Sequence, residues 1–261
     1  MSNERICSNC NAVVPEGHHF CGKCGARYAS HGEGEEEDET LYFGPLQAPG
    51  RAKLMLIKGE GVEGLSYHLN ATEHVAGRQS GAVLFPDDDY LSPSHASFSY
   101  RDNQLYLQDD DSENGTFLRI REPTRLEDGD ELMIGEQRLR IEYLDIQGEY
   151  PMRNDTLMYV SPPEDYKFRV VHVVEGGRDG RASCSPNNDI LVGREGCDLN
   201  FPNDPHVSPR HARLTWSDGH VIVTDQDSKN GTCVEVRGER KLQDGDYVMF
   251  GSEIVRVEVN E

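Results

Sequence analysis

One polar pattern occurs twice in this chain at a constant spacing, and this repeat limits the possible folds more than any other feature. Arg78 recurs as Arg194, an offset of 116 residues, and the blocks that follow it recur at the same offset without insertions. The shared blocks are Gly-Arg, Ser-Pro-x-His-Ala, Asn-Gly-Thr and Leu-x-Asp-Gly-Asp, followed by Gly135 and Gly251. Because polar and turn-forming residues dominate these blocks, the repeat describes loops of equal length, and loops commonly carry binding sites.

Short alternating apolar runs inside each repeat predict β-strands. Leu105 and Leu107 alternate with polar residues, and Val221 and Val223 do so at the matching positions of the second repeat. Clusters of Gly, Asp, Asn and Pro separate such runs about every ten residues, without a sustained helical period. We therefore predict an all-β protein with two β-sandwiches in tandem, each of about 100 residues and large enough for a core. The expected limits of the sandwiches are residues 52–145 and 167–261.

Charge and cysteine content narrow the classes of function. The 26 Lys and Arg stand against 47 Asp and Glu, a net charge of -21, which argues against a general nucleic-acid binder. No apolar run approaches the roughly 20 residues that cross a bilayer, so no membrane contact is expected. The seven cysteines do not form the pattern of a disulfide framework, and the expected location is a reducing cytoplasm.

Two segments have the composition of linkers. Residues 28–51 include an acidic run that begins at Glu33, and such a segment cannot bury enough apolar surface to order itself. Residues 146–166 contain the breakers Gly148, Pro151, Pro162 and Pro163. The expected order is therefore a small unit at residues 5–27, an acidic linker, the first sandwich, a second linker and the second sandwich.

The small unit carries two Cys-x-x-Cys pairs, which are Cys7 with Cys10 and Cys21 with Cys24. Two such pairs can surround one ion with four thiolates, the closed tetrahedral arrangement of structural zinc. About 25 residues cannot fold on hydrophobic burial alone, so bound Zn2+ supplies the missing stability. The segment resembles the short zinc ribbons found at the N-termini of bacterial regulatory proteins.

Other uses of these cysteines fit less well. A thioredoxin-like redox centre needs one such pair in a βαβ context, which is absent here. Haem attachment needs a histidine after the second cysteine, whereas Asn11 and Gly25 occupy those positions. His18 and His19 could replace a ligand, although solvated loop histidines are the more common case.

The repeated loops of the second copy combine donors that suit a phosphate group on a peptide. The Arg194 guanidinium offers a planar fork for phosphate oxygens, and Ser208 offers a hydroxyl donor. Asn230 precedes a glycine in a turn, where its amide can hold the backbone of an extended peptide, and Lys229 adds positive charge. We interpret His211 as a buried brace for the Ser208 loop. This set predicts a site for a dianion carried by an extended peptide.

The combination of these motifs resembles the forkhead-associated (FHA) domain in both repeats, over most of residues 52–145 and 168–261. The resemblance implies antiparallel β-sandwiches that bind phosphothreonine peptides through their loops at one end. It assigns ligand binding to Arg194, Ser208 and Asn230 in the second repeat, and to Arg78, Ser92 and Asn114 in the first. His211 and His95 are then the structural supports of the binding loops.

The repeats differ in charge around the expected site. The family often has Ser or Thr before Asn-Gly-Thr, whereas the second repeat has Lys229 and the first has Glu113. The second repeat also has Arg210 where the first has Ser94. A carboxylate about 5 Å from a phosphate dianion costs on the order of 1–5 kcal/mol before salt screening. We therefore expect the second repeat to bind phosphopeptide more readily, with Arg210 and Lys229 contributing. The alternative for the first repeat is a sandwich that serves as a spacer or a protein contact.

Two catalytic interpretations are rejected. Gly59-x-Gly61-x-x-Gly64 matches a dinucleotide fingerprint, but the following residues alternate like a strand, so a hairpin turn explains the glycines. Ser208 with His211 could suggest a nucleophile and its base, but no nucleophile elbow and no third member accompany them. We expect no enzymatic activity.

The repeat also includes a threonine segment ahead of each sandwich. Thr40 and Thr156 are each preceded by an acidic residue and followed by Leu, with an aromatic residue at the third position. Both lie in the expected linkers, where a kinase could reach them. We hypothesise that Thr40, and secondarily Thr156, is phosphorylated and then binds an FHA domain of the same or another chain. A short tether gives an effective concentration of about a millimolar. The acidic threonine segment resembles those of small bacterial FHA proteins that switch in this way. The alternative is that the apolar residues around each threonine pack as an arm on the sandwich.

The sequence thus predicts a non-enzymatic scaffold that binds phosphothreonine proteins downstream of a Ser/Thr protein kinase, with possible intramolecular or homo-oligomeric self-binding. One alternative is a nucleic-acid-associated regulator that acts through the zinc ribbon, and the acidic charge argues against it. The other alternative is a structural adaptor that binds independently of phosphate.

Overall fold

The computed structural model describes residues 5–7, 9–14, 21, 23–24, 51–59, 64–144, 152–154, 156–157 and 164–259. The chain divides into two compact units, Met1–Ala48 and Pro49–Glu261, which are considered separately. Among the described residues there is no helix with the length and apolarity needed to cross a membrane.

The small unit contains one short antiparallel pair. Strand β1 (Arg5–Ile6) pairs with β2 (Val13–Val14), and Cys7 follows β1 directly. Cys7, Val14 and Cys21 form a small buried cluster. Sulfur atoms therefore make up much of this core.

Ten strands come from the first sequence repeat. They are β3 (Ala52–Lys58), β4 (Ser66–Leu69), β5 (Glu73–Gly77), β6 (Val83–Leu84), β7 (Ala96–Arg101), β8 (Gln104–Asp109), β9 (Thr116–Arg119), β10 (Thr124–Leu126), β11 (Glu131–Ile134) and β12 (Gln137–Tyr143). A hairpin of β13 (Met152–Arg153) and β14 (Thr156–Leu157) follows. The glycine-rich stretch after β3 leads into the antiparallel strand β4, as the sequence predicts, and not into a helix.

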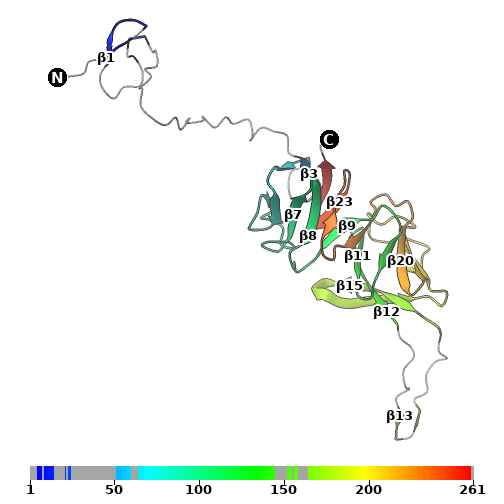
Figure 1. Cartoon of the computed structure of the whole chain (residues 1–261). Helices are drawn as coiled ribbons and strands as arrows, with labels where there is room; N and C mark the ends of the chain where they lie inside the picture. Colours follow the sequence, from blue (N-terminus) through cyan, green and yellow to red (C-terminus); the bar gives the residue numbers. More distant parts are fainter. Residues whose placement is uncertain are drawn as a thin grey trace. The chain divides into compact units, whose positions relative to one another are not determined.

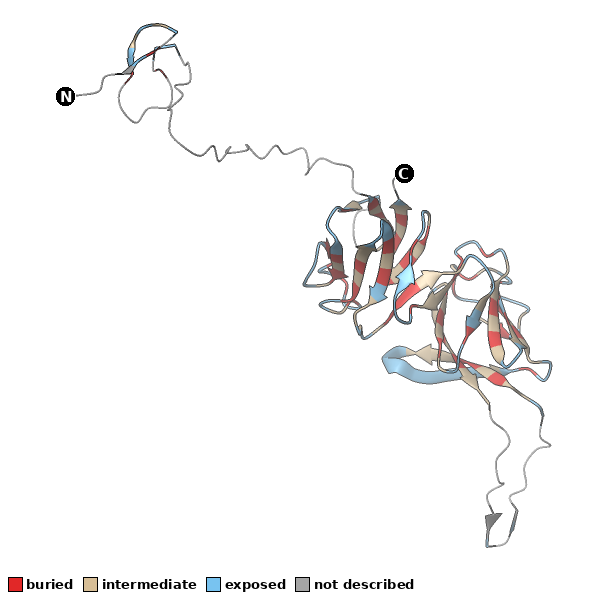
Figure 2. Ribbon diagram, viewed as in Figure 1, coloured by how far each residue is buried: buried red, intermediate tan, exposed pale blue. Residues whose placement is uncertain are grey.

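The second repeat supplies the remaining elements. They are β15 (Phe168–Val174), the 3-10 turn η1 (Glu175–Gly177), β16 (Arg178–Cys184), β17 (Asp189–Gly193), β18 (Leu199–Asn200), β19 (Ala212–Ser217), β20 (His220–Asp225), β21 (Thr232–Glu235), β22 (Arg240–Lys241), β23 (Tyr247–Phe250) and β24 (Glu253–Val259). Buried residues alternate with less buried ones along strands such as β20, β23 and β24 (Figure 2). The prediction of an all-β fold is confirmed.

Apart from the β13-β14 hairpin, the described strands of the main unit form one long sheet and two shorter ones (Figure 1). The long sheet has ten strands in the order β16-β15-β12-β11-β21-β9-β23-β24-β3-β4. The two five-stranded sheets have the orders β22-β8-β7-β5-β6 and β10-β20-β19-β17-β18. Each short sheet therefore includes one strand of the other repeat, β22 in the first case and β10 in the second.

The two repeats exchange their C-terminal strands. β12 of the first repeat pairs with β15 of the second, and β24 of the second pairs with β3 of the first. The core around β3 to β8 accordingly includes residues of the second repeat, Val236, Leu242, Val248, Phe250, Val255 and Val257. The core around β15 to β20 includes residues of the first repeat, Leu126, Leu132, Ile134, Leu139 and Ile141.

This exchange differs from the expected pair of contiguous sandwiches. The limits 52–145 and 167–261 remain a prediction for the sequence repeats, but each sandwich of the structure combines segments of both. Each repeat passes from one sandwich to the other at β9 or β21. These two strands pair antiparallel, with Leu118 opposite Val234. These two residues are themselves equivalent in the repeat, so the pairing relates the two halves by an approximate twofold axis.

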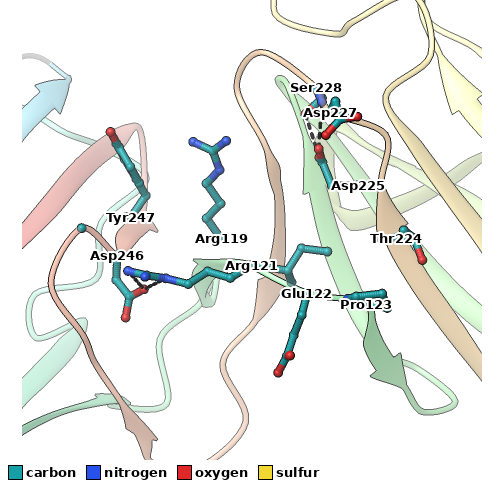
Figure 3. A pocket seen from close by; sticks show the side chains of 12 residues that line it. Arg119, Arg121, Glu122, Pro123, Thr224, Asp225, Asp227, Ser228, Asp246 and Tyr247 are labelled. Carbon is teal, nitrogen blue, oxygen red and sulfur yellow. Dashed lines mark hydrogen bonds and ion pairs between the residues drawn. The ribbon is translucent and has the colours of Figure 1, made fainter.

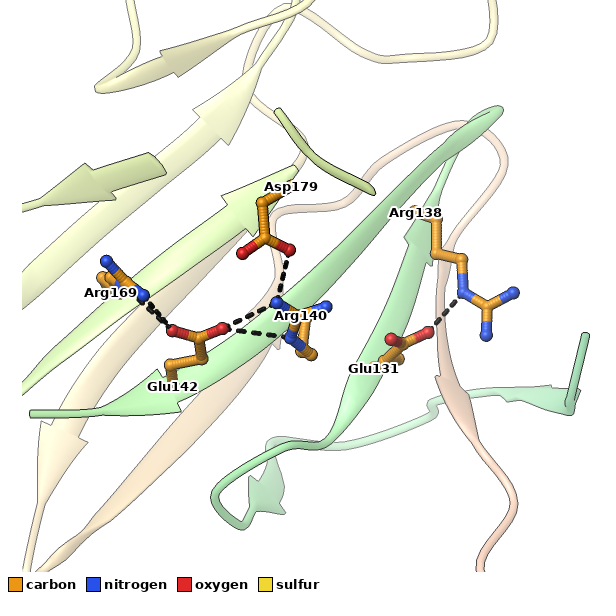
Figure 4. Close-up of polar contacts among 6 residues, drawn as sticks. All are labelled: Glu131, Arg138, Arg140, Glu142, Arg169 and Asp179. Carbon is orange, nitrogen blue, oxygen red and sulfur yellow. Dashed lines mark hydrogen bonds and ion pairs between the residues drawn. The ribbon is translucent and has the colours of Figure 1, made fainter. Parts of the chain in front are cut away.

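Charged side chains hold the exchanged strands together at equivalent places (Figure 4). Arg169 of β15 forms an ion pair of 2.5 Å with Glu142 of β12, and Glu142 also accepts from Arg140. At the matching positions Lys53 of β3 pairs with Glu258 of β24 at 2.7 Å. The Arg140 guanidinium, acting with Arg169, keeps the pKa of the Glu142 carboxyl below its usual value. Both junctions between the repeats thus carry charge-assisted contacts.

Candidate functional site

The second repeat organises its candidate binding loops around a buried histidine. His211 is fully buried, and its Nδ1 accepts a hydrogen bond of 3.0 Å from the Ser208 backbone amide. Its Nε2 lies 3.1 Å from the carbonyl oxygen of Gly231, so Nε2 carries the proton and donates. Burial lowers the pKa of His211, which keeps the ring neutral. The ring therefore ties the serine loop to the Asn-Gly turn.

Hydrogen bonds between the same loops fix the positions of the other candidate residues. The Arg194 backbone amide donates to the Ser208 carbonyl at 2.9 Å, and the Ser208 hydroxyl oxygen accepts from the Lys229 amide at 3.1 Å. The Asn230 side chain donates to the His206 carbonyl at 2.8 Å. The structure thus brings Arg194, Ser208, Lys229 and Asn230 together through direct hydrogen bonds between their loops.

The first repeat has the same backbone frame, meaning the set of hydrogen bonds that joins the histidine, the serine loop and the Asn-Gly turn. Buried His95 accepts from the Ser92 amide at 3.1 Å and lies 3.1 Å from the Gly115 carbonyl. The Ser92 hydroxyl oxygen accepts from the Glu113 amide at 3.0 Å, and Asn114 donates to a neighbouring carbonyl at 2.8 Å. Burial lowers the pKa of His95 as it does for His211. The backbone frame is therefore equally formed in both repeats, and the difference lies in the charges.

The two arginines have different partners. Nη1 of Arg78 lies 3.3 Å from Oδ1 of Asp89 in an ion pair, and its buried Nε has no hydrogen-bond partner within the described residues. Pro205 replaces this aspartate in the second repeat. Arg194 makes no side-chain hydrogen bond or ion pair with any residue that the structure describes. Its guanidinium is thus the one available to an incoming anion.

The remaining charges reinforce this contrast. Lys229 and Arg210 are exposed beside Arg194, whereas Glu113 and Ser94 are exposed at the matching positions of the first repeat. Ser94 lies 3.4 Å from the carboxylate of Asp110, a further acid of the first site. The Asp89 contact was not predicted from the sequence. Its only signal there was the acidic run Asp87 to Asp89.

The exchange adds a residue of the other repeat to each site. A Cβ atom on Gly231 would lie 1.9 Å from Nε of Arg119, which comes from β9. At Gly115 the corresponding contact, 3.0 Å, is with Oε1 of Glu235 on β21. Neither residue could be predicted from the sequence, because contiguous sandwiches would place Arg119 beside the first site and Glu235 beside the second. No signal in a single sequence identifies the exchange.

The four cysteines of the small unit lie close together. Their sulfur atoms are all within 4.8 Å of one another, with 3.6 Å between Cys7 and Cys24 and 3.5 Å between Cys10 and Cys21. Zn–S bonds of about 2.3 Å in a tetrahedron place sulfur atoms roughly 3.8 Å apart, so this donor set fits a metal ion. Backbone amides of Lys23 and Cys24 lower the pKa of the Cys21 thiol to about 6, whereas the pKa of the Cys10 thiol rises to about 12 because contacts with the other thiols outweigh the Ala12 amide. The identity of the ion as zinc stays a prediction.

The structure describes one of the two candidate phosphoacceptors. Thr156 lies on β14 and is exposed, with its hydroxyl 3.3 Å from the Asn154 carbonyl. Thr40 lies outside the described residues, as do His18 and His19. Modification of either threonine stays a prediction.

Comparison with known proteins identifies the family of this chain. The FHA domain profile matches residues 74–135 and 190–251, which contain all the loops described above. The chain belongs to the FHA family.

Its relatives include bacterial regulators. The oxoglutarate dehydrogenase inhibitor of Corynebacterium glutamicum is 31% identical over 99 residues, which are 37% of this chain and 68% of the relative. The glycogen accumulation regulator GarA of Mycobacterium tuberculosis is 36% identical over 94 residues. That match covers 35% of this chain and only 57% of the mycobacterial protein. A solved structure, the FHA domain of the CT664 protein from Chlamydia trachomatis, has 10% identity and a TM-score of 0.34, and covers 81% of this chain and 100% of its own.

Proposed function

We propose that this protein is an adaptor that binds phosphothreonine-containing proteins in Ser/Thr kinase signalling, and that its second site is the stronger binder. The observation that carries this proposal is the Arg194 guanidinium, which has no partner among the described residues, set against the Arg78–Asp89 ion pair of the first site. A phosphate dianion gains charge-assisted hydrogen bonds from Arg194 without first displacing a carboxylate. The names of the curated relatives describe a regulator and an inhibitor, which supports a regulatory rather than an enzymatic role.

The chemistry of the second site indicates how it would recognise its ligand. Arg194 and Ser208 would hold the phosphate oxygens, and Arg210 and Lys229 would add positive potential around them. Asn230 would hold the peptide backbone, and buried His211 would keep the loops in place. Recognition would then depend on the phosphate, with the flanking residues deciding between targets.

Arg194→Ala in the full-length protein tests this proposal, with Arg78→Ala as the matched control. Loss of a charged, multiply bonded phosphate contact should weaken phosphothreonine peptide binding about 100-fold, because bonds to charged groups contribute about 1.5–3 kcal/mol each. Arg78→Ala should change total binding little, and Asp89→Ala should strengthen the first site by releasing Arg78. The measurement is fluorescence anisotropy with a degenerate phosphothreonine peptide library and its unphosphorylated counterpart.

Two results would contradict the proposal. Binding that survives Arg194→Ala and does not require phosphate would indicate the structural adaptor instead. A larger loss from Arg78→Ala than from Arg194→Ala would assign the dominant site to the first repeat.

We further propose that phosphorylation of Thr40, or of exposed Thr156, provides a ligand for the second site within this chain or in another copy. The short connection to the sandwiches would make an intramolecular site fill even at modest affinity. A synthetic phospho-Thr40 peptide should bind the full-length protein more tightly than the unphosphorylated peptide, in a manner that Arg194→Ala removes. Equal binding of the two peptides would exclude Thr40 as such a ligand.

A further inference from the structure

Arg119 reaches the second site from the other repeat. It is the last residue of β9, and β9 pairs with β21, the strand that follows the Asn-Gly turn of the second site. The guanidinium passes so close to Gly231 that a Cβ atom there would lie 1.9 Å from Nε and 2.6 Å from Cζ. Gly231 itself has a φ of 80° and follows Asn230 directly. Arg119 therefore lies against the turn that we expect to hold a bound peptide.

A groove of about 620 Å³ opens beside this contact (Figure 3). Arg119 of β9 and the segment 120–123 that follows it line the groove, together with the end of β20, the turn after β20 and the start of β23 with the turn before it. In Figure 3 the Arg119 side chain extends between Tyr247 and the turn with Asp227 and Ser228, away from Glu122. The groove thus joins the second site to residues of both repeats.

Three charged groups of the groove, Arg121, Asp246 and Asp225, already have partners. Arg121 bonds to Asp246 at 2.6 Å and to the Asp244 carbonyl at 2.5 Å. Asp225 accepts from the hydroxyls of Ser228 and Thr232, each at 2.7 Å.

Arg119 differs, because its guanidinium makes no hydrogen bond or ion pair with any described residue and only lies over the Tyr247 ring, 5.3 Å from its centroid. Two exposed carboxylates also line the groove, Asp227 in the turn beside Arg119 and Glu122 away from it. Arg119 is thus the cation of the groove without a carboxylate partner among the described residues, and it attracts an anion to the end where it meets Gly231.

The first site carries the opposite charge at this place. Glu235 is the repeat equivalent of Arg119, and its Oε1 lies 3.0 Å from the position of a Cβ on Gly115. Glu235 is half-buried and has an arginine partner, Arg237, at 3.9 Å. The exchange therefore gives a cation to the site that already has Lys229, and a carboxylate to the site that already has Glu113.

We propose that Arg119 is a specificity-determining residue of the second site, and that it binds an anionic side chain next to the phosphothreonine of a bound peptide. An extended peptide advances about 3.3 Å per residue, so a group held beside Gly231 belongs to a residue close in sequence to the one held at Asn230. The anion is a carboxylate or a second phosphate, since both offer the oxygens that a guanidinium fork binds. This inference rests on the proposed phosphopeptide function of the second site.

The test uses the full-length protein with Arg78→Ala, so that only the second site binds. The probes are fluorescein-labelled peptides with one phosphothreonine in an alanine background, and variants with a single Asp or a second phosphothreonine at each flanking position. At one position the acidic residue should strengthen binding about tenfold, and Arg119→Gln should remove that gain while leaving the alanine peptide nearly unchanged. Arg119→Lys should keep part of it. The matched control, Glu235→Gln, should keep all of it.

The outcomes separate this inference from the proposed function. If Arg194→Ala leaves phosphopeptide binding intact, the proposed function fails. If Arg194→Ala abolishes binding but Arg119→Gln weakens all peptides equally or none, the function stands and the role of Arg119 is overturned. If Glu235→Gln removes the preference instead, Arg119 does not serve the second site, and the strands are not exchanged as described. Thermal unfolding of each variant checks that the loss does not reflect an unfolded protein.

Discussion

At the residue scale, Gly135 shows why small repeated residues are needed at positions distant in sequence from the binding loops that they contact. It lies in the turn between β11 and β12 with a φ of 62°, in the left-handed region that other residues enter at a cost. A Cβ atom there would lie 2.7 Å from Val207 Cγ2 and 3.0 Å from Asp204 Oδ2. The Asp204 carboxylate accepts the Glu136 backbone amide at 2.9 Å, which fixes the exchanged hairpin under the loop that leads to Ser208. Gly251 and Asp88 repeat this contact in the first sandwich.

Gly135→Ala should therefore lower the free energy of unfolding by about 2–4 kcal/mol, from left-handed strain and from overpacking against Val207. The matched control is Gly196→Ala, because Gly196 has a φ of 69° but nothing within 4 Å of an added Cβ. That variant should lose only the strain of about 1 kcal/mol. Urea denaturation followed by the fluorescence of Trp216, which packs in the same core, measures both. Equal losses for the two variants would show that the close contact at Gly135 has no energetic weight.

At the scale of elements, the sequence predicts where strands and loops lie better than it predicts how strands pair. The alternation of apolar residues marked strands such as β8 and β20, and Leu107 and Val223 are fully buried as expected. The candidate loops could also be predicted, because each set comes from one contiguous stretch that ends at an Asn-Gly turn. Both conclusions depend on local pattern, which a single sequence contains.

There is a physical reason why the exchange could not be predicted from the sequence. The pairs Leu139 with Ile141 and Val255 with Val257 present similar apolar side chains at equal spacing, so either hairpin fits either sandwich. Backbone hydrogen bonds of a ladder do not depend on side-chain identity, and hydrophobic burial has no direction. The extended path of β9 and β21 from one sandwich to the other decides which hairpin joins which sandwich. The same path places Arg119 beside the second site. Contacts between residues far apart in sequence were therefore the part of the site that was missed.

At the scale of the whole molecule, the exchange means that neither repeat completes its own core. Eleven buried side chains, six in one core and five in the other, belong to the opposite repeat. Each such side chain contributes about 1.5–3 kcal/mol when it is fully buried. Together they exceed the roughly 8 kcal/mol that holds a micromolar complex, even after the entropy of association. The two halves should thus remain bound to each other without a covalent connection.

Cutting the chain between Leu157 and Glu164, at an introduced protease site, tests this expectation. The cleaved protein should elute from a size-exclusion column at the position of the intact chain, although a denaturing gel shows two fragments. It should also bind phosphothreonine peptide as the intact protein does, because the loops of the second site and the strands β11 and β12 behind them stay together. Contiguous sandwiches would instead separate into two species of about half the mass, since a cut connection would then leave no shared core. Arg119→Gln tests the strand exchange independently, because this substitution can change binding at the second site only if the strands are exchanged.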